Sequence, residues 1–312
     1  MESCFHAGEL ALQERAGVRE KLEAFGQRAM RSEMPEQHRE LFTKLPTLWV
    51  GSLDAHGRPW ASMLIGRPGF IEAPDARHLR IAAEPGFGDP LRAHLRVGAP
   101  LGLLGLEPAT RRRNRMNGTL VEVAPGGFTV RVDQSFGNCP QYIQAREPRW
   151  LAGPADFAAT RSVTPEGPRL QPATRRLVER SDTLFIATAA SGGVDVSHRG
   201  GRPGFVRVDD VGGFSALTIP DFRGNAMFAT LGNIVAHPRA GLVFVDFDSG
   251  DLLQLTGTAE LIWNGPEVAA FAGAQHLLRI SVEQGVWMPS ALPLRWSAPK
   301  QAPQLAATGT WR

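Results

Sequence analysis

Apolar residues along this chain fall mostly into short runs that are bounded by Gly and Pro. Clear examples are "TLWVG" at 47–51, "PLGLLGL" at 100–106 and "AGLVFVDF" at 240–247. Runs of this length between turn residues are typical of β-strands. Many such strands favour antiparallel sheets that close into barrels. The pattern therefore predicts a mainly β fold with accessory helices (α+β).

The first 34 residues follow a helical pattern instead. Their apolar spacing predicts an amphipathic helix broken near Gly17, with the following residues on one face: Leu10, Ala11, Val18, Leu22 and Phe25. Short helices opened by Pro35 and Pro172 are expected before the strands at 47 and 183. Two more helices are predicted at 89–95 and 225–237, with Asp89 and Asn225 as N-caps.

One segment of the chain occurs twice. "GRPWASMLIGRPGF" at 57–70 is echoed by "VDVSHRGGRPGF" at 194–205, and "TLWVG" at 47–51 by "TLFIA" at 183–187. The repeat predicts two copies of one fold. We therefore expect an N-terminal helical segment at 1–34, a first domain at 35–145, a Pro-rich connector at 146–171 and a second domain at 172–312.

Composition narrows the class of protein further. The chain of 312 residues is 43% hydrophobic and has a net charge of +3. It shows neither an 18-residue apolar run nor the apolar core of a signal peptide, so no membrane association and a cytoplasmic location are expected. Its two cysteines and scattered histidines match no metal-binding spacing, so we predict no metal site.

The two copies differ in their chemistry. Arg199 of the second copy falls on Met63 or Leu64 of the first, and Arg223 falls on Phe87. Glycines flank both arginines and let the backbone approach a ligand closely. Ser197 and Asn225 add neutral polar groups, and a helix N-terminus at Asn225 would favour an anion. A phosphate pocket is therefore predicted in the second copy, with a degenerate site in the first.

Several motifs resemble the pyridoxamine 5'-phosphate oxidase-like superfamily of FMN-binding split barrels. The likeness lies in "LFIATAASGGVDVSHRGGRPGFVRV" at 184–208, "IPDFRGN" at 219–225, "LGNIVAHPRAGLVFVDF" at 231–247 and "LQLTGTAEL" at 253–261. The first copy resembles the family more weakly, through residues 51–70. The resemblance implies two split barrels in tandem that form an intrachain pseudo-dimer.

The resemblance also implies a bound FMN and the residues that hold it. Its cofactor-binding set would be Ser197, His198, Arg199, Gly200, Arg223, Gly224, Asn225, Gln254, Arg295 and Trp296. Arg199 and Arg223 would clamp the phosphate, and His198 would position them or donate a proton. Two alternatives stay open: Gln254 as a structural hydrogen-bonding group, and Trp296 as part of the core.

On this view the first barrel forms the wall of the site. Residues 111–118 ("RRRNRMNG") and 138–143 ("NCPQYI") are candidate contributors, although a run of arginines is also typical of a solvated face. A dimer of two fused chains is left open. The full set of basic residues that pyridoxamine oxidases use for their substrate is not found.

We interpret the chain as an FMN-dependent oxidoreductase whose catalytic residues, substrate and redox partner are unknown. A non-catalytic flavin-binding or electron-carrier protein needs the same pocket and is the alternative. A nucleic-acid binder is disfavoured, because the chain has one Tyr and most Phe residues lie in strand-like runs.

Overall fold

The computed structural model describes residues 3–151, 162–191 and 193–311. The helices are α1 (Ala7–Arg15), α2 (Arg19–Ala29), α3 (Glu36–Lys44), α4 (Leu91–His94), α5 (Pro172–Arg180), α6 (Ala229–Ala236), α7 (Pro266–Ala270) and the 3-10 turns η1 (Pro108–Thr110) and η2 (Pro303–Ala307). The strands are β1 (Thr47–Leu53), β2 (Pro59–Ile65), β3 (Ile71–Glu72), β4 (His78–Ile81), β5 (Pro100–Glu107), β6 (Arg112–Ala124), β7 (Gly127–Gly137), β8 (Pro148–Trp150), β9 (Thr164–Glu166), β10 (Thr183–Ala190), β11 (Gly193–Gly200), β12 (Arg207–Val211), β13 (Phe214–Phe222), β14 (Arg239–Val245), β15 (Leu252–Ile262), β16 (Ala274–Met288) and β17 (Leu294–Trp296).

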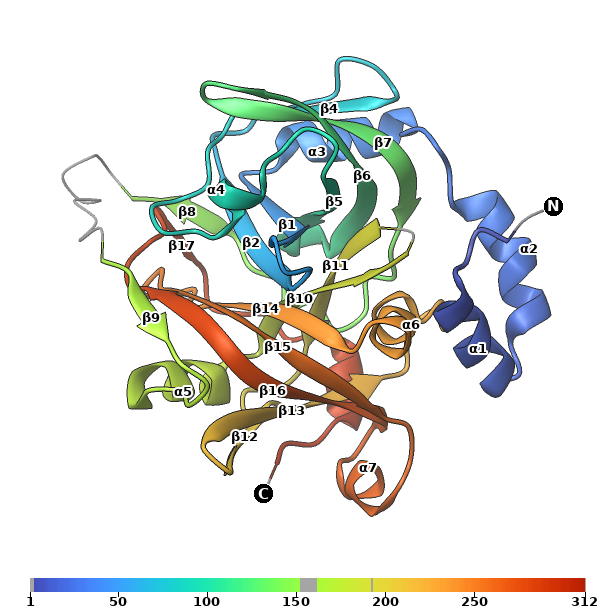
Figure 1. Ribbon diagram of the computed structural model, residues 1–312, viewed down its shortest axis with the longest axis vertical. Coiled ribbons are helices and arrows are strands. Elements are labelled where there is room, and N and C mark those ends of the chain that lie inside the picture. Colours follow the sequence, from blue (N-terminus) through green and yellow to red (C-terminus); the bar gives the residue numbers. More distant parts are fainter. Residues whose placement is uncertain (1–2, 152–161, 192, 312) are drawn as a thin grey trace.

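Two large antiparallel sheets form the body of the described chain. The first has the strand order β2-β1-β5-β6-β7-β4-β3, and the second has the order β11-β10-β14-β15-β16-β13-β12. Every strand of the first sheet thus has a counterpart at the same place in the second. In Figure 1 the first copy, in blue and green, lies above the second, in yellow to red. The predicted fold class, mainly β with two split barrels in tandem, is confirmed.

Each copy has its own hydrophobic core. The first is built around residues such as Phe42 and Leu103, and the second around residues such as Phe205 and Phe244. All four side chains are fully buried. Burial of this kind is the dominant stabilising contribution to folding.

A third apolar cluster joins the two barrels. Trp49 of β1 stacks on Phe185 of β10, with ring centroids 3.4 Å apart. At two places, a hairpin strand of one copy crosses a glycine of the other copy. A Cβ on Gly102 of β5 would lie 2.5 Å from the Val194 carbonyl oxygen of β11. A Cβ on Gly241 of β14 would lie 2.3 Å from the Pro59 carbonyl oxygen of β2. These two matched close approaches make the chain an intrachain pseudo-dimer.

The N-terminal helix α1 packs against α6 of the second copy, and α2 packs against α1 (Figure 1). The predicted break is confirmed, since Gly17 separates the helices with φ +68°. α1 packs on α6 through a glycine pair, because a Cβ on Gly8 would lie 2.2 Å from the Gly232 carbonyl oxygen. Only glycines allow two helices to meet at this distance.

The predicted N-caps of α4 and α6 are wrong. α4 begins after Pro90, and α6 begins after Phe228, which has a left-handed backbone. Asp89 and Asn225 instead accept hydrogen bonds from the backbone N–H two residues further on, at 2.9 and 3.2 Å. This local turn competes with helix capping for the same side chains.

The predicted connector is tied to the second barrel on both sides. β8 pairs with β17, and β9 adds to the second sheet at β16. Residues 152–161 of the connector lie outside the described residues. The exact domain boundaries stay a prediction.

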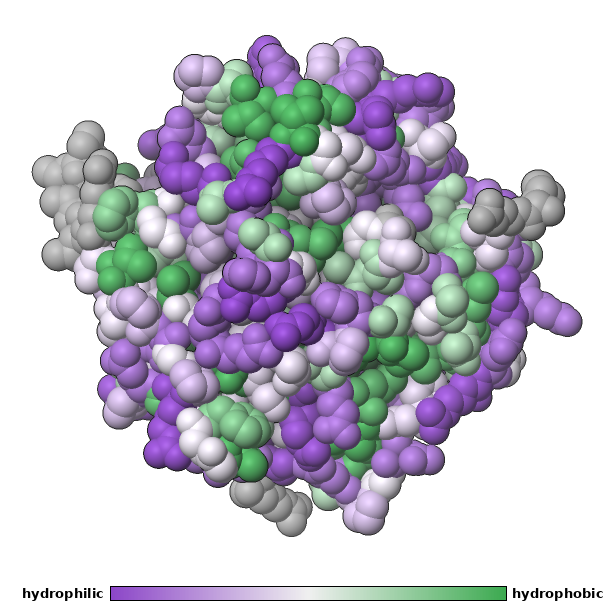
Figure 2. Space-filling view, in the orientation of Figure 1, coloured by the Kyte–Doolittle hydropathy of each residue, from purple (hydrophilic) through white to green (hydrophobic). Residues whose placement is uncertain are grey.

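Helices of the described ranges are all too short or too polar to cross a membrane. On the face shown in Figure 2, apolar patches are separated by hydrophilic residues.

Candidate functional site

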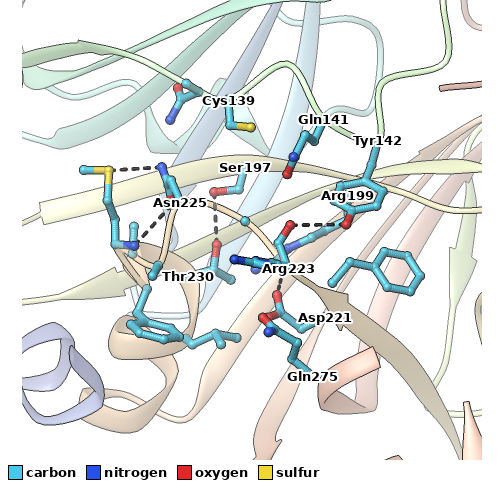
Figure 3. A pocket seen from close by; sticks show the side chains of 18 of the residues that line it. Cys139, Gln141, Tyr142, Ser197, Arg199, Asp221, Arg223, Asn225, Thr230 and Gln275 are labelled. Carbon is cyan, nitrogen blue, oxygen red and sulfur yellow. Dashed lines mark hydrogen bonds and ion pairs between the residues drawn. The ribbon is translucent and has the colours of Figure 1, made fainter. Parts of the chain in front are cut away.

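A cavity of about 580 Å³ lies between the two barrels. The first copy contributes residues of β6 and the loop after β7, and the second contributes β11, the end of β13 and the start of α6. Figure 3 shows Cys139, Gln141 and Tyr142 on one side of this space and Asp221 and Gln275 on the other. Its size is in the range of small-molecule and cofactor sites.

Four arginines from the two barrels line the cavity: Arg113, Arg115, Arg199 and Arg223. Arg115 of β6 forms an ion pair with Asp195 at 2.9 Å and donates a hydrogen bond to Ser197. Arg199 of β11 forms an ion pair with Asp221. The Nε atoms of Arg115 and Arg199 are buried and have no partner among the described residues.

Arg113, also on β6, differs from Arg115 and Arg199 in its hydrogen-bond partners. Its guanidinium donates to the Cys139 carbonyl oxygen at 2.6 Å and to His198 Nδ1 at 3.2 Å. No carboxylate of the described residues forms an ion pair with it. Burial and the neighbouring arginines lower the pKa of Arg113 to about 10. A buried cation without an acid partner is costly unless a ligand supplies negative charge.

His198 is held in one protonation state by this arginine. A guanidinium can only donate, so His198 Nδ1 is the acceptor and the ring proton lies on Nε2. Burial, followed by the charges of Arg113 and Arg199, lowers the pKa of His198 well below its ordinary range. A neutral His198 positions Arg113, and this geometry favours that role over proton donation.

Three residues around the cavity have a left-handed backbone that side chains other than glycine rarely adopt. They are Tyr142 (φ 63°), Ala226 (φ 57°) and Phe228 (φ 62°). The Tyr142 hydroxyl donates to the Arg223 carbonyl oxygen at 3.2 Å and so ties two of these loops together. Backbone strain of roughly 1–3 kcal/mol per residue persists where the surroundings enforce it, and it is concentrated at functional sites.

The N-terminal helices complete one wall. Val18, Lys21 and Leu22 line the cavity, and Leu22 belongs to a small apolar cluster with Phe136 and Met227. That cluster joins the N-terminal helices to both barrels. Predicting the first 34 residues as a helical segment therefore missed their place at the cavity.

Seven of the predicted cofactor-binding residues lie together at the cavity: Ser197, His198, Arg199, Gly200, Arg223, Gly224 and Asn225. Ser197 also accepts a hydrogen bond from Thr230 of α6 at 3.0 Å. Arg223, Gly224 and Asn225 are exposed at the rim, whereas His198 is buried. Because α6 begins at Ala229, Asn225 does not lie at a helix N-terminus.

The structure does not bring the other three predicted residues to this cavity. Gln254 is fully buried between the barrels, where its Nε2 donates to Ser62 Oγ at 2.8 Å and to the Ala61 carbonyl oxygen at 2.9 Å. Arg295 donates to the carbonyl oxygens of neighbouring residues, and Trp296 packs edge-on against Phe247. These contacts agree with the structural alternatives for Gln254 and Trp296.

The cavity arginines of β6 come from the run at 111–115. β6 begins at Arg112, and strand alternation places Arg113 and Arg115 on the same face, toward the cavity. Arg111 and Arg112 instead donate to carbonyl oxygens elsewhere, including those of Ile143 and Gln37. The period of two could have separated Arg112 from Arg113 and Arg115, but not Arg111, which precedes β6 and has a left-handed backbone.

Metal-binding chemistry has little support in the described ranges, which contain no group of three or more His, Cys, Asp or Glu side chains that could hold an ion. The cavity is instead lined by guanidinium, hydroxyl and amide groups. This donor set suits an anionic organic ligand.

Fold and cavity together define a paired split-barrel protein with one cationic cavity between its barrels. Residues 170–295, which contain most of the second barrel, match the family model described as pyridoxamine 5'-phosphate oxidase. The second barrel is thus similar in sequence to the pyridoxamine 5'-phosphate oxidase family.

Several solved structures are similar to parts of the chain. HupZ of Group A Streptococcus is 17% identical, with 36% of this chain and 90% of that chain covered at a TM-score of 0.29. A putative pyridoxamine 5'-phosphate oxidase of Lactobacillus delbrueckii (16%, covering 34% and 95%, TM-score 0.27) and the HutZ haem storage protein of Vibrio cholerae (16%, covering 39% and 95%, TM-score 0.27) are also similar. Comparison with curated proteins gives no match.

Proposed function

We propose that the chain binds FMN in the cavity between its barrels and acts as an FMN-dependent oxidoreductase. The observation that carries this proposal is the half-buried guanidinium of Arg113, which faces a ligand-sized cavity and has no carboxylate partner among the described residues. A phosphate dianion would supply the missing charge and would accept charge-assisted hydrogen bonds from the arginines that line the cavity.

FMN, when bound, supplies hydride or single-electron transfer, while the protein binds and orients it. Arg113, Arg115 and Arg199 would hold its phosphate, with Ser197 as a neutral partner. Neutral His198 keeps the Arg113 guanidinium at the cavity wall. Lys21 and Leu22 of the N-terminal helices would restrict solvent access from their side.

The direct test compares FMN with riboflavin, which lacks the phosphate. Wild-type protein is expected to bind FMN at least tenfold more tightly, because charge-assisted hydrogen bonds are worth about 1.5–3 kcal/mol each. Arg113→Met should remove most of this preference, and the ligand-free variant should unfold at a higher temperature because an uncompensated buried charge is gone. Fluorescence titration and thermal unfolding measure the two effects.

Arg112→Met is the matched control, because Arg112 is the next residue on β6 and bonds to the Gln37 carbonyl oxygen outside the cavity. This variant should bind FMN and riboflavin with the same affinities as the wild-type protein. Equal affinity of the wild-type protein for FMN and riboflavin would overturn the phosphate assignment. A haem spectrum in place of a flavin spectrum would overturn the choice of cofactor.

An electron carrier without catalysis needs the same cavity and is the alternative. Steady-state oxidation of NADH or NADPH with an added acceptor separates the two roles. A bound flavin that stays oxidised with both nicotinamides would contradict a nicotinamide-driven reductase. Cytoplasmic location and the absence of a nucleic-acid partner also belong to this proposal.

A further inference from the structure

The strand registers give a residue-by-residue match between the two copies. In the hairpin β1–β2, Leu48 pairs with Leu64, and in the hairpin β10–β11, Leu184 pairs with Arg199. Leu64 is therefore the counterpart of Arg199, which settles the choice that the sequence left open. By the same register, Ser62 corresponds to Ser197.

A second match concerns the strands that reach across between barrels. Leu104 pairs with Arg115 on β6, and its counterpart Val243 pairs with Gln254 on β15. Gln254 thus occupies in the second copy the place that Arg115 occupies in the first. Likewise, Leu252 is the counterpart of Arg113.

These matches define two related sites on opposite sides of the barrel interface. At the cavity, Arg115 of the first barrel donates to Ser197 of the second. At the related place, Gln254 of the second barrel donates to Ser62 of the first at 2.8 Å. The cross-barrel contact is the same in both sites, but the cationic group is present in only one.

The related site is filled by a carboxylate of the chain itself. Asp89 comes from the loop between β4 and α4, and this loop corresponds to the one between β13 and α6 that borders the cavity. Its Oδ1 accepts from Ser62 Oγ at 2.7 Å, from the Leu91 backbone N–H at 2.9 Å and from Gln254 Nε2 at 3.2 Å. The side chain is 5% exposed, and this burial raises the pKa of Asp89.

We propose that this first-copy site is a latent carboxylate-binding site, which Asp89 occupies as a built-in ligand. Three donors converge on one oxygen of Asp89, and Ser62 and Gln254 belong to different barrels. With Leu64 and Leu252 in place of two arginines, the site lacks the charge for a phosphate dianion. It fits a small monoanion such as formate or acetate once the Asp89 side chain is removed.

The test is chemical rescue of Asp89→Gly. Removing the carboxylate leaves buried donors without an acceptor, so the variant should unfold at a lower temperature than the wild type. Added formate or acetate should raise its unfolding temperature in a saturable manner and leave the wild type unchanged. Formamide, which has a similar shape and no charge, should have no comparable effect.

Leu64→Ala is the matched control. Leu64 is a buried neighbour on β2, and its loss weakens the same barrel without opening an anion site. Its unfolding temperature should not respond to formate. Should Asp89→Gly fail to fold, Asp89→Ala made in the presence of formate provides the same comparison after dialysis. Absent rescue, equal rescue by formamide or equal rescue of Leu64→Ala would each overturn the proposal.

Discussion

At the scale of single residues, the cavity is organised by groups whose charge state is set by burial. His198 is kept neutral and Arg113 is held beside it, so that one guanidinium faces the cavity uncompensated. Glu9 of α1 is a third such group. Burial, with a smaller contribution from the charge of Asp195, raises the pKa of Glu9 from 4.5 to about 8. The native state therefore holds a proton on Glu9 at neutral pH.

Glu9→Gln should make stability less dependent on pH. The unfolded chain releases the Glu9 proton near pH 4.5 and the folded chain only near pH 8, so this group makes stability fall as pH rises between these values. Glutamine keeps an acceptor for the His6 backbone N–H, which donates to Glu9 at 3.0 Å. Urea unfolding at a series of pH values measures the difference from the wild type.

Glu20→Gln on exposed α2 serves as the control and should follow the wild type. The charged or titratable groups near Glu9 are Asp195, Arg115 and His6, whose Nε2 lies 3.6 Å from a Glu9 carboxylate oxygen, and all three are unchanged in both variants. An identical pH dependence in Glu9→Gln and the wild type would show that Glu9 is ionised in the folded protein.

At the scale of elements, the sequence predicted the strand runs, the break at Gly17 and the helices after Pro35 and Pro172 because these follow from local periodicity and turn residues. The sequence also singled out two short runs that line the same cavity, 197–200 on β11 and 223–225 in the loop after β13. The start of α6 was missed, because a left-handed backbone at Phe228 has no local signature.

The place of Gln254 could not be predicted from its own strand. Its partners Ser62 and Asp89 lie 192 and 165 residues away in the sequence. They meet Gln254 only because the two barrels pack together. The same packing selects Arg113 and Arg115 from the arginine run. Contacts between the barrels depend on the strand register in both copies. The apolar pattern of one strand does not specify this register.

Gly241→Ala should disrupt this packing of elements. The added Cβ would lie 2.3 Å from the Pro59 carbonyl oxygen, so β2 would have to move away from β14. Overpacking of this kind costs about 1–3 kcal/mol of unfolding free energy. Gly86→Ala, where a Cβ would meet nothing within 4 Å, is the control for the loss of glycine. Equal stability of the two variants in urea would show that the barrel interface accommodates the added methyl group without a loss of stability.

At the scale of the whole molecule, a fused pair of barrels has two related sites that need not be equal. A dimer of identical single barrels would have to repeat every site residue on both sides of its interface. Here Arg113 and Arg199 face the cavity on one side, whereas Leu252 and Leu64 are buried at the related positions. Fusion thus allows one side to hold a ligand while the other is closed by Asp89.

The binding stoichiometry should therefore be one FMN per chain. The cavity supplies the arginines for one phosphate, and the related site is filled from within and has leucines in their place. Calorimetric titration of ligand-free protein measures the stoichiometry, and thermal unfolding checks it independently. At an FMN concentration 100 times Kd, one site adds about 2.7 kcal/mol of stability. Two equivalents of FMN per chain would contradict the inequality of the sites, because the second phosphate would then be bound without the arginines that distinguish them.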